Sequence, residues 1–345
     1  MEYRFLGRTG LQVSTISFGT MTFGGLGRFQ HCGATQVDEA VEQVRLCLEV
    51  GVNVFDTADV YSQGLSEEIL GRALGRHRDD VLVATKMHNA MGDDVNAIGQ
   101  SRYHIMRACE ASLRRLGTDH IDLFQMHGYD GRTDVFETLR VLDDLVRSGK
   151  VRYLGCTEFS AWHLMKALGL ADAGHLVRFS ALQGYYSILG RELEYEFVPL
   201  CIDQGVGILA WSPLAGGFLT GKYRQGEPDP PDTRRQGMGN PGTIDEAHGY
   251  TIVEALEVIA AERGVSPAQV AVNYVRGKPG VTSVVIGARN REQLADDLAA
   301  ASWSLSQEEM SRLDEISQRP LPYPYWNQQR FNQDRMCWPE VAVAP

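Results

Sequence analysis

Eight short apolar runs recur along the chain, each of strand length and rich in Val, Ile and Leu. Apolar and polar positions do not alternate cleanly within them, which is typical of strands buried on both faces of a parallel sheet. The runs lie at residues 16–21, 52–57, 81–86, 121–127, 151–157, 179–186, 206–212 and 281–287.

Segments with apolar residues at helical spacing separate these runs. Residues 36–50 form such a segment, and it stops at Gly51, a residue that commonly ends helices. Residues 135–150 place Arg147 and Lys150 in the last turn, where positive charge favours the helix dipole. Further helices are predicted at 66–75, 102–117, 160–173, 191–204, 267–277 and 291–301.

Eight strand–helix units without an intervening linker predict a (β/α)8 TIM barrel, with residues 1–345 forming a single domain. Residues 2–14 predict a β-hairpin that covers the bottom of the barrel. Extra helices are predicted after strand 7, at 244–264, and after strand 8, at 306–317. The tail, residues 319–345, is expected to lie either over the catalytic face or along the barrel wall.

Composition narrows the range of partners. The net charge of −11 argues against a general binder of nucleic acid or anionic membranes, because both need a basic surface. The six cysteines are scattered without paired spacing, which favours free thiols. No signal-peptide core and no run of 18 apolar residues occur, so we expect a cytoplasmic protein.

The residues that end the eight strands are where a barrel enzyme places its chemistry. Most of them are polar or aromatic, which packing alone does not require. They are Thr20, Asp56, Lys86, His127, Glu158, Gln183, Trp211 and Arg289.

Asp56, Tyr61, Lys86 and His127 come from neighbouring strand ends and suggest acid catalysis. A Lys ammonium near a tyrosine favours the phenolate, so we expect Lys86 to lower the pKa of Tyr61. Asp56 would pair with Lys86, and His127 would orient a substrate oxygen. This set suits proton donation to a carbonyl oxygen. Taken singly, each residue also has a structural interpretation, as a helix cap, a packing ring, a rim lysine or a core histidine.

The glycine-rich stretch 211–223 suggests a pyrophosphate site, because its backbone N–H groups can cradle phosphates. Tyr223 stands where a nucleoside triphosphate loop needs Ser or Thr, so that type of site is not expected. Trp211 offers a ring to stack on a nicotinamide, and Gln183 can hydrogen-bond its carboxamide. The alternative is a flexible turn without a ligand.

Residues 287–290 open a predicted helix whose N-terminus favours anions. Arg289 adds positive charge there, which suits a 2′-phosphate and hence NADP(H) rather than NAD(H); a solvated rim arginine is the alternative. No GxGxxG motif occurs, so a Rossmann domain is not supported. No metal motif is apparent, and we expect no metal site.

Several stretches together resemble the aldo-keto reductase family over about residues 3–318. They include GTMTFGG, FDTADVYSQGLSEEILGRAL, VLVATK, SLRRLGTDHIDLFQMHGYD, WSPLAGGFLTGKY and VIGARNREQL. The resemblance is to the aryl-alcohol-dehydrogenase-like and potassium-channel-β-subunit-like branch. It implies a barrel that binds NADP(H) in extended form and transfers hydride to an aldehyde or ketone carbon.

The resemblance also implies residue roles. Tyr61 would be the proton donor, Lys86 and Asp56 would tune its pKa, and His127 would orient the substrate. The implied cofactor-binding residues are Gly19, Thr20, Met21, Thr157, Glu158, Gln183, Trp211, Ser212, Leu214, Gly216, Lys222, Gly287, Arg289, Gln293 and Asp297.

Two departures from the family pattern stand out. Thr157 and Glu158 occupy positions where the family usually has Ser-Asn holding the carboxamide. Glu158 can accept a hydrogen bond from the carboxamide but cannot donate one, so we expect it to shift cofactor affinity or to face the substrate. Asp296 and Asp297 replace a common Glu-Asn near the adenine, which keeps acceptors but loses a donor and weakens the NADP preference.

The substrate is expected to be a small carbonyl compound or alcohol, bound by a monomer or homo-oligomer. Loops at 87–100, 128–134 and 223–243 would form its pocket, joined by tail residues Tyr323, Tyr325, Trp326 and Phe331 unless these cover the wall. Two alternative functions stay open. One is a dehydrogenase working in the oxidative direction, and the other is a cofactor-sensing regulatory subunit with slow turnover.

Overall fold

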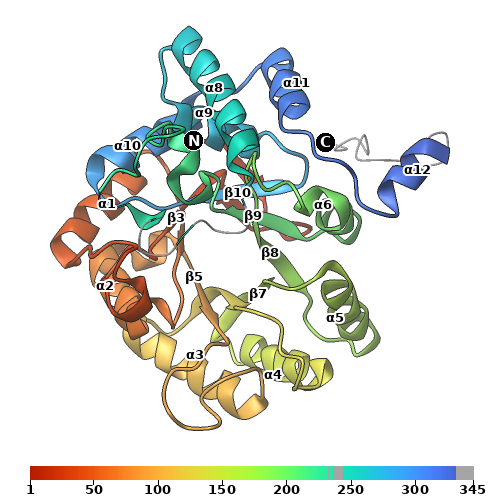
Figure 1. The fold of residues 1–345 in the computed structure, drawn as a ribbon. Helices are drawn as coiled ribbons and strands as arrows, with labels where there is room; N and C mark the ends of the chain where they lie inside the picture. The colour runs from red at the N-terminus through yellow and green to blue at the C-terminus, as the bar shows by residue number, and fades with distance from the viewer. Residues whose placement is uncertain (232, 236–238, 240–243, 332–345) are drawn as a thin grey trace.

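Eight parallel strands close into a barrel in the order β10-β3-β4-β5-β6-β7-β8-β9. Figure 1 shows the strands at the centre of the molecule, inside the ring of helices. The computed structural model describes residues 1–231, 233–235, 239 and 244–331. Each apolar run of the sequence supplies one strand, so the predicted barrel is confirmed. The strands are β3 (Ile16–Gly19), β4 (Val54–Asp56), β5 (Leu82–Met87), β6 (Ile121–Met126), β7 (Val151–Thr157), β8 (Phe179–Tyr185), β9 (Gly207–Trp211) and β10 (Val281–Ile286).

Helices surround the barrel, and each strand is followed by at least one of them (Figure 1). The barrel helices are α1 (Val37–Glu49), α2 (Leu65–Leu74), α3 (Arg102–Leu116), α4 (Val135–Arg147), α5 (Ala161–Ala173), α6 (Leu193–Gln204), α9 (Pro267–Arg276) and α10 (Arg291–Ala299). The extra helices are α8 (Glu246–Arg263) after β9, and α11 (Gln307–Ile316) and α12 (Tyr325–Phe331) after β10. Within the described residues, no helix is long and apolar enough to cross a membrane.

The N-terminal hairpin closes one end of the barrel. Its strands, β1 (Tyr3–Phe5) and β2 (Gln12–Ser14), pair antiparallel. Leu6 and Val13 are buried in one cluster with barrel residues that include Val54, Leu123 and Leu209. Because Val54 and its neighbours lie near the N-terminal ends of the strands, the hairpin seals the end of the barrel opposite the C-terminal ends of the strands. The predicted hairpin is therefore confirmed, and it leaves the other end open for chemistry.

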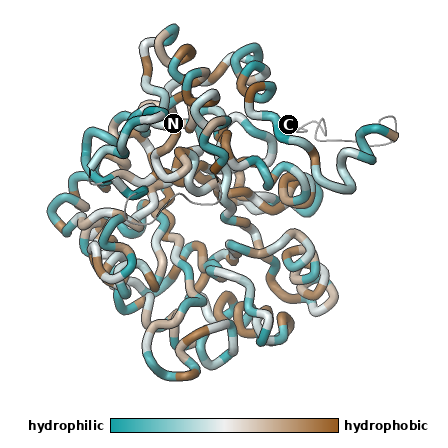
Figure 2. Tube along the Cα trace, in the orientation of Figure 1, coloured by the Kyte–Doolittle hydropathy of each residue, from teal (hydrophilic) through white to brown (hydrophobic). Residues whose placement is uncertain are grey.

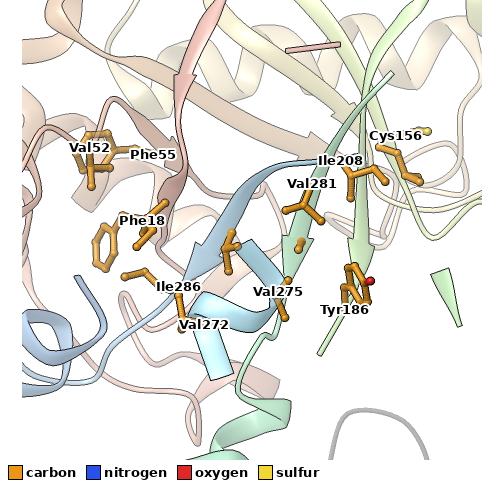
Figure 3. Packing of buried hydrophobic residues seen from close by; sticks show 14 of the residues in the cluster. Phe18, Val52, Phe55, Cys156, Tyr186, Ile208, Val272, Val275, Val281 and Ile286 are labelled. Carbon is orange, nitrogen blue, oxygen red and sulfur yellow. The ribbon is translucent and has the colours of Figure 1, made fainter. Parts of the chain in front are cut away.

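The main core fills the layer between the barrel strands and the helices. Figure 3 shows Phe18, Phe55 and Ile208 of the strands in the same packed layer as Val272 and Val275 of α9. Figure 2 shows hydrophilic colour on many outer turns of the helices and hydrophobic colour toward the barrel. Burial of this apolar surface holds the strands in a fixed register. The strand ends are thus rigid supports for side chains.

The described part of the tail lies against the outer wall. Tyr325 stacks on Tyr195 of α6, with ring centroids 5.6 Å apart, and its hydroxyl donates to Glu196 at 2.7 Å. In Figure 1, α12 lies at the edge of the molecule beyond α6. Tyr323, Trp326 and Phe331 are exposed. Of the two placements considered from the sequence, residues 319–331 follow the wall, whereas 332–345 fall outside the described residues.

The hairpin seal generates a stability prediction. Leu6 is 1% exposed, whereas Phe5 beside it is 57% exposed. Leu6→Ala should lower the free energy of unfolding by about 2–4 kcal/mol, because it opens a cavity under the barrel. Urea denaturation measures this value, and Phe5→Ala is the matched control. Equal effects of the two substitutions would contradict the sealing role of Leu6.

Candidate active site

Four side chains from adjacent strand ends meet at the open end of the barrel. Asp56 ends β4, Lys86 lies near the end of β5, and His127 directly follows β6. Tyr61 begins the short 3-10 helix η2 (Tyr61–Gly64), which follows β4. We call these four residues the tetrad. Their predicted proximity, inferred only from strand order, is found in the structure.

Lys86 links the acid to the phenol. Its Nζ donates to Asp56 Oδ2 at 2.5 Å, to the Thr57 carbonyl oxygen at 2.8 Å and to Tyr61 Oη at 3.3 Å. The Lys86 side chain is 0% exposed. A buried ammonium needs an opposite charge and hydrogen-bond acceptors, and this one has an acceptor for each of its three N–H donors. The expected pairing of Asp56 with Lys86 is present.

The pKa of Tyr61 differs from our expectation. Burial raises the pKa of Tyr61 above its ordinary value, and the Asp56 carboxylate adds to the rise. The Lys86 ammonium acts in the expected, lowering direction, but it does not outweigh burial. The lowering effect expected of Lys86 is therefore present, but burial outweighs it and the pKa of Tyr61 is raised overall. The phenol stays protonated at neutral pH, which is the form a proton donor needs.

Lys86 remains charged next to that phenol. Burial opposes its charge, but the Asp56 carboxylate beside it leaves the pKa of Lys86 raised. The ammonium also lies 4.9 Å from the centre of the Tyr61 ring. A fixed positive charge at this distance stabilises any negative charge that develops on the phenol oxygen.

His127 forms one side of the site next to the phenol. Its ring lies 5.7 Å from that of Tyr61, nearly perpendicular to it. Burial lowers the pKa of His127 well below its usual range, and the positive charges of Lys86 and Arg28 act in the same direction. The imidazole is therefore neutral at neutral pH, and its Nδ1 is buried without a hydrogen-bond partner. A neutral imidazole suits hydrogen bonding to a substrate better than proton donation.

Two glutamine side chains complete the surroundings of Asp56. Gln183 Nε2 donates to Asp56 Oδ1 at 2.8 Å, and Gln125 Nε2 donates to the same oxygen at 3.1 Å. Gln183 was expected at the nicotinamide, and this contact uses its amide nitrogen inside the site. Sequence reasoning missed Gln125. Its position opposite Lys86 in the β5–β6 register would have indicated it, had the register been known.

A second buried charge cluster lies behind the tetrad and was also missed. Glu67 accepts from Thr85 Oγ1 and from Arg115 Nε, both at 2.6 Å. Asp59 is 0% exposed, and neither of its carboxyl oxygens is in hydrogen-bonding geometry with a donor. Burial raises the pKa of Asp59 well above its usual range, and Glu67 raises it further against the opposing pull of Arg115 and Lys86.

Hydroxyl groups connect the C-terminal ends of β3 and β4 at the open end of the barrel. Thr20 donates its backbone N–H to the Asp56 carbonyl oxygen at 2.8 Å, and its hydroxyl is 2.9 Å from that of Ser66. The Ser66 hydroxyl also lies 3.0 Å from that of Thr57. Thr20 is fully buried, whereas Gly19 and Met21 on either side are partly exposed. These bonds tie the end of β3 to the end of β4.

The loop after β9 contains several residues in the left-handed backbone conformation. Ser212 has a φ of 57°, and Gly216 has a φ of 69°. The Gly216 N–H donates to Ser212 Oγ at 3.2 Å. Leu214 lies between these two residues and directly precedes the 3-10 helix η4 (Ala215–Thr220). Left-handed conformations at non-glycine residues are costly and cluster at functional sites. Trp211 begins this loop, and its buried Nε1 has no hydrogen-bond partner.

Positive charge converges from the loops after β9 and β10. Partial burial and the Arg289 guanidinium lower the pKa of Lys222, so the two cations lie close enough to affect each other. Gln293 Oε1 accepts from the Arg289 backbone N–H at 3.1 Å. Gly287 approaches the backbone of β3, because a Cβ there would lie 3.3 Å from the Gly19 carbonyl oxygen. This arrangement suits an anionic ligand.

The two acids of α10 are in different environments. Asp296 accepts from Ser266 Oγ and Gln269 Nε2 of the neighbouring segment, both at 2.6 Å. Asp297 is buried, and burial together with Asp296 raises the pKa of Asp297 to about 7. The two residues, grouped together from the sequence, therefore differ: Asp296 is held by protein donors, whereas Asp297 changes charge near neutral pH.

Glu158 stands at the end of β7 in a left-handed conformation, with a φ of 57°. Its carboxylate is exposed and accepts from the Thr157 hydroxyl at 3.1 Å. Thr157 is itself buried. The structure therefore places an exposed carboxyl group on the rim, two strands away from Lys86 in the barrel order.

Of the expected substrate loops, 87–100 and 128–134 lie together beside His127. The Gly99 N–H donates to the His88 carbonyl oxygen at 2.8 Å, and Asp130 accepts from Gln100 N at 2.7 Å. The loop 223–243 is described only in part, with 232, 236–238 and 240–243 outside the described residues. Among the residues that are described, no group of three or more His, Cys, Asp or Glu could hold a metal ion.

The buried Asp59 generates a pH prediction. A folded-state pKa raised above the unfolded value gives stability that is complete below the ordinary Asp pKa and is lost as pH rises. Asp59→Asn removes this loss. The difference in melting temperature, variant minus wild type, should therefore grow between about pH 5 and about pH 8 in calorimetry. The exposed Asp93→Asn is the control, and a pH-independent difference for Asp59→Asn would contradict the buried-acid account.

Comparison with known proteins identifies the family. The sequence profile of the Aldo/keto reductase family matches residues 15–318. The chain is 37% identical over 331 residues to the uncharacterized oxidoreductase YrpG of Bacillus subtilis, covering 93% of this chain and 97% of that protein. It is 37% identical over 310 residues to a probable voltage-gated potassium channel subunit beta of Arabidopsis thaliana, covering 87% and 91%.

A third relative is the versiconal hemiacetal acetate reductase of Aspergillus parasiticus, which is 32% identical over 340 residues and covers 91% of this chain and 96% of that protein. The family profile spans the strands and helices that build the barrel, including all four tetrad positions. The resemblance stated from the sequence motifs is thus confirmed. The chain belongs to the aldo/keto reductase family of oxidoreductases.

Proposed function

We propose that the protein reduces an aldehyde or ketone to an alcohol with NADPH, using Tyr61 as the proton donor. The observation that carries the proposal is the buried Lys86 ammonium, which lies 2.5 Å from Asp56 and 3.3 Å from Tyr61. It provides a charged anchor beside a protonated phenol at the open end of the barrel. The versiconal hemiacetal acetate reductase relative is in keeping with this activity by its name.

The chain's own residues support a nicotinamide cofactor. Trp211 has a partly exposed ring with an unpartnered Nε1, and the turn through Ser212 and Gly216 presents backbone N–H groups. Lys222 and Arg289 would hold the phosphates, and their convergence favours NADP(H) over NAD(H). When bound, this cofactor supplies the hydride for reduction or accepts it for oxidation.

Proton transfer is the part of the reaction that the tetrad carries. His127, held neutral, hydrogen-bonds the carbonyl oxygen and positions it near Tyr61 Oη. As the carbon is reduced, the oxygen becomes far more basic than a phenolate, so Tyr61 gives up its proton despite its raised pKa. Lys86 then stabilises the phenolate left behind, and Asp56 keeps Lys86 charged and in place.

The oxidative direction uses the same groups in reverse, with Tyr61 as the base. The reaction equilibrium and the ratio of reduced to oxidised cofactor decide the net direction, because the tetrad catalyses both directions. A regulatory role is the second candidate function, because two relatives of the chain are probable voltage-gated potassium channel β subunits of plants. Vigorous turnover of a small carbonyl compound would argue against that role.

One prediction of the proposed function concerns Tyr61 as the proton donor. Tyr61→Phe should lower kcat for carbonyl reduction by about 10²–10⁴-fold, because it removes only the acidic hydroxyl. NADPH oxidation, followed by absorbance against aldehydes, keto-sugars and cyclic ketones, measures this loss. The dissociation constant for NADPH should stay within about twofold, as cofactor fluorescence can show. Undiminished turnover in the variant would refute the assignment of Tyr61.

A further prediction concerns the effect of Glu158 on NADPH affinity. Glu158→Asn removes a negative charge from the rim and adds an amide donor, so NADPH should bind about threefold to tenfold more tightly. Titration calorimetry measures the affinity. Glu254→Asn on the exposed face of α8 is the matched control. If NADPH affinity and the turnover of every substrate are the same as in wild type, Glu158 has no part in the site.

A further inference from the structure

Asp56 carries the only carboxylate in the tetrad, and both of its oxygens are used. Oδ2 accepts from Lys86, while Oδ1 accepts from two neutral amides, those of Gln183 and Gln125. Asp56 is 3% exposed, so water cannot replace either amide freely. A buried carboxylate oxygen that loses its donors is left unsatisfied, which is costly.

Gln125 differs from Gln183 in what else it faces. Gln125 is 0% exposed, and its carbonyl oxygen Oε1 is buried without a hydrogen-bond partner among the residues that the structure describes. Its one hydrogen bond from the side chain goes to Asp56 Oδ1. An amide buried with half of its hydrogen-bonding capacity unused is unfavourable by itself. The remaining hydrogen bond goes to a charged acceptor, and such bonds are strong enough to offset part of the cost of burying the amide.

The barrel interior is shaped to hold Gln125 in this position. Gln125 is the register partner of Lys86 on β5 and of Gly155 on β7, and Gly155 is followed around the barrel by Ala181 on β8. A Cβ at Gly155 would lie 3.0 Å from Gln125 Cγ and 3.3 Å from the Ala181 carbonyl oxygen. The missing side chain at Gly155 therefore leaves room for Gln125 on the adjacent strand β6.

We propose that Gln125 is a positioning residue, which fixes the Asp56 carboxylate so that Oδ2 faces Lys86, and that Gly155 makes the space this requires. A neutral donor suits this task, because it fills Oδ1 without competing with Lys86 for the negative charge. Gln125 acts on the reaction only through Asp56 and Lys86. The inference rests on the proposed function for its kinetic consequence, but the contact itself is tested without turnover.

Gln125→Leu tests the kinetic consequence. It removes the amide at similar volume, so kcat should fall by about tenfold while the NADPH dissociation constant stays within about twofold. Gly155→Ala should do the same by displacing Gln125. Gln183→Leu is the comparison variant, because Gln183 belongs to the proposed cofactor site and its loss should weaken both kcat and NADPH binding. A kcat for Gln125→Leu within twofold of wild type, or a parallel loss of NADPH affinity, would overturn the proposal.

Gln125→Glu gives a signature that a merely structural residue would not. A protonated Glu can donate to Asp56 as the amide does, whereas an ionised Glu would place two carboxylates against each other, which raises its pKa. The kcat of Gln125→Glu should therefore approach the wild-type value at acidic pH and fall as pH rises. Gln125→Leu should be impaired equally across the range. Parallel pH profiles for wild type and Gln125→Glu would overturn the proposal.

Thermal unfolding tests the contact without any assay of activity. A raised folded-state pKa gives stability that is present at low pH and lost as pH rises. The melting temperature of Gln125→Glu should therefore drop relative to wild type with increasing pH, and that of Gln125→Leu should differ from wild type by a constant amount. If wild type turns over no carbonyl compound, the proposed function fails. The unfolding experiment still decides whether Gln125 holds Asp56, because it needs no turnover. A pH-independent difference for Gln125→Glu would refute it.

Discussion

The ion pair between Lys86 and Asp56 is the interaction on which the rest of the active site depends. An ammonium buried inside a barrel is costly to desolvate, and it persists because a carboxylate lies 2.5 Å away and a backbone carbonyl accepts a second hydrogen bond. The pair holds a permanent positive charge 3.3 Å from the Tyr61 hydroxyl. Without it, no fixed positive charge would lie beside the Tyr61 hydroxyl.

Maintaining this pair constrains several layers of the fold. Parallel strands bring Asp56 and Lys86 to the same end of the barrel, and the hairpin with Leu6 and Val13 seals the opposite end. The missing side chain at Gly155 leaves space for Gln125 on the adjacent strand. Burial and the nearby Glu67 carboxylate raise the pKa of the Asp59 carboxyl group behind the tetrad. The Lys86–Asp56 pair itself is surrounded by a neutral imidazole and two neutral amides.

Much of the architecture could be predicted from the sequence, because apolar runs and helical spacing report directly on burial. All eight strands and the hairpin follow from that pattern, as does the convergence of the tetrad. What could not be predicted depends on distances across the barrel. Gln125 lies inside an apolar run and Glu67 inside a helix, whereas Asp59 lies in the turn after β4, and nothing in these patterns shows which groups they meet. The net pKa of Tyr61 could not be predicted for the same reason, since burial outweighs the effect of Lys86 that motif spacing indicates.

The central claim is that burial dominates the protonation of Tyr61 even beside Lys86. The most direct measurement is the phenolate absorbance of Tyr61 as a function of pH, taken as the difference between wild type and Tyr61→Phe. The account predicts a midpoint above the ordinary tyrosine pKa of about 10, rising further in Lys86→Met. A midpoint below that value would contradict it, because Lys86 and not burial would then set the acidity of the proton donor.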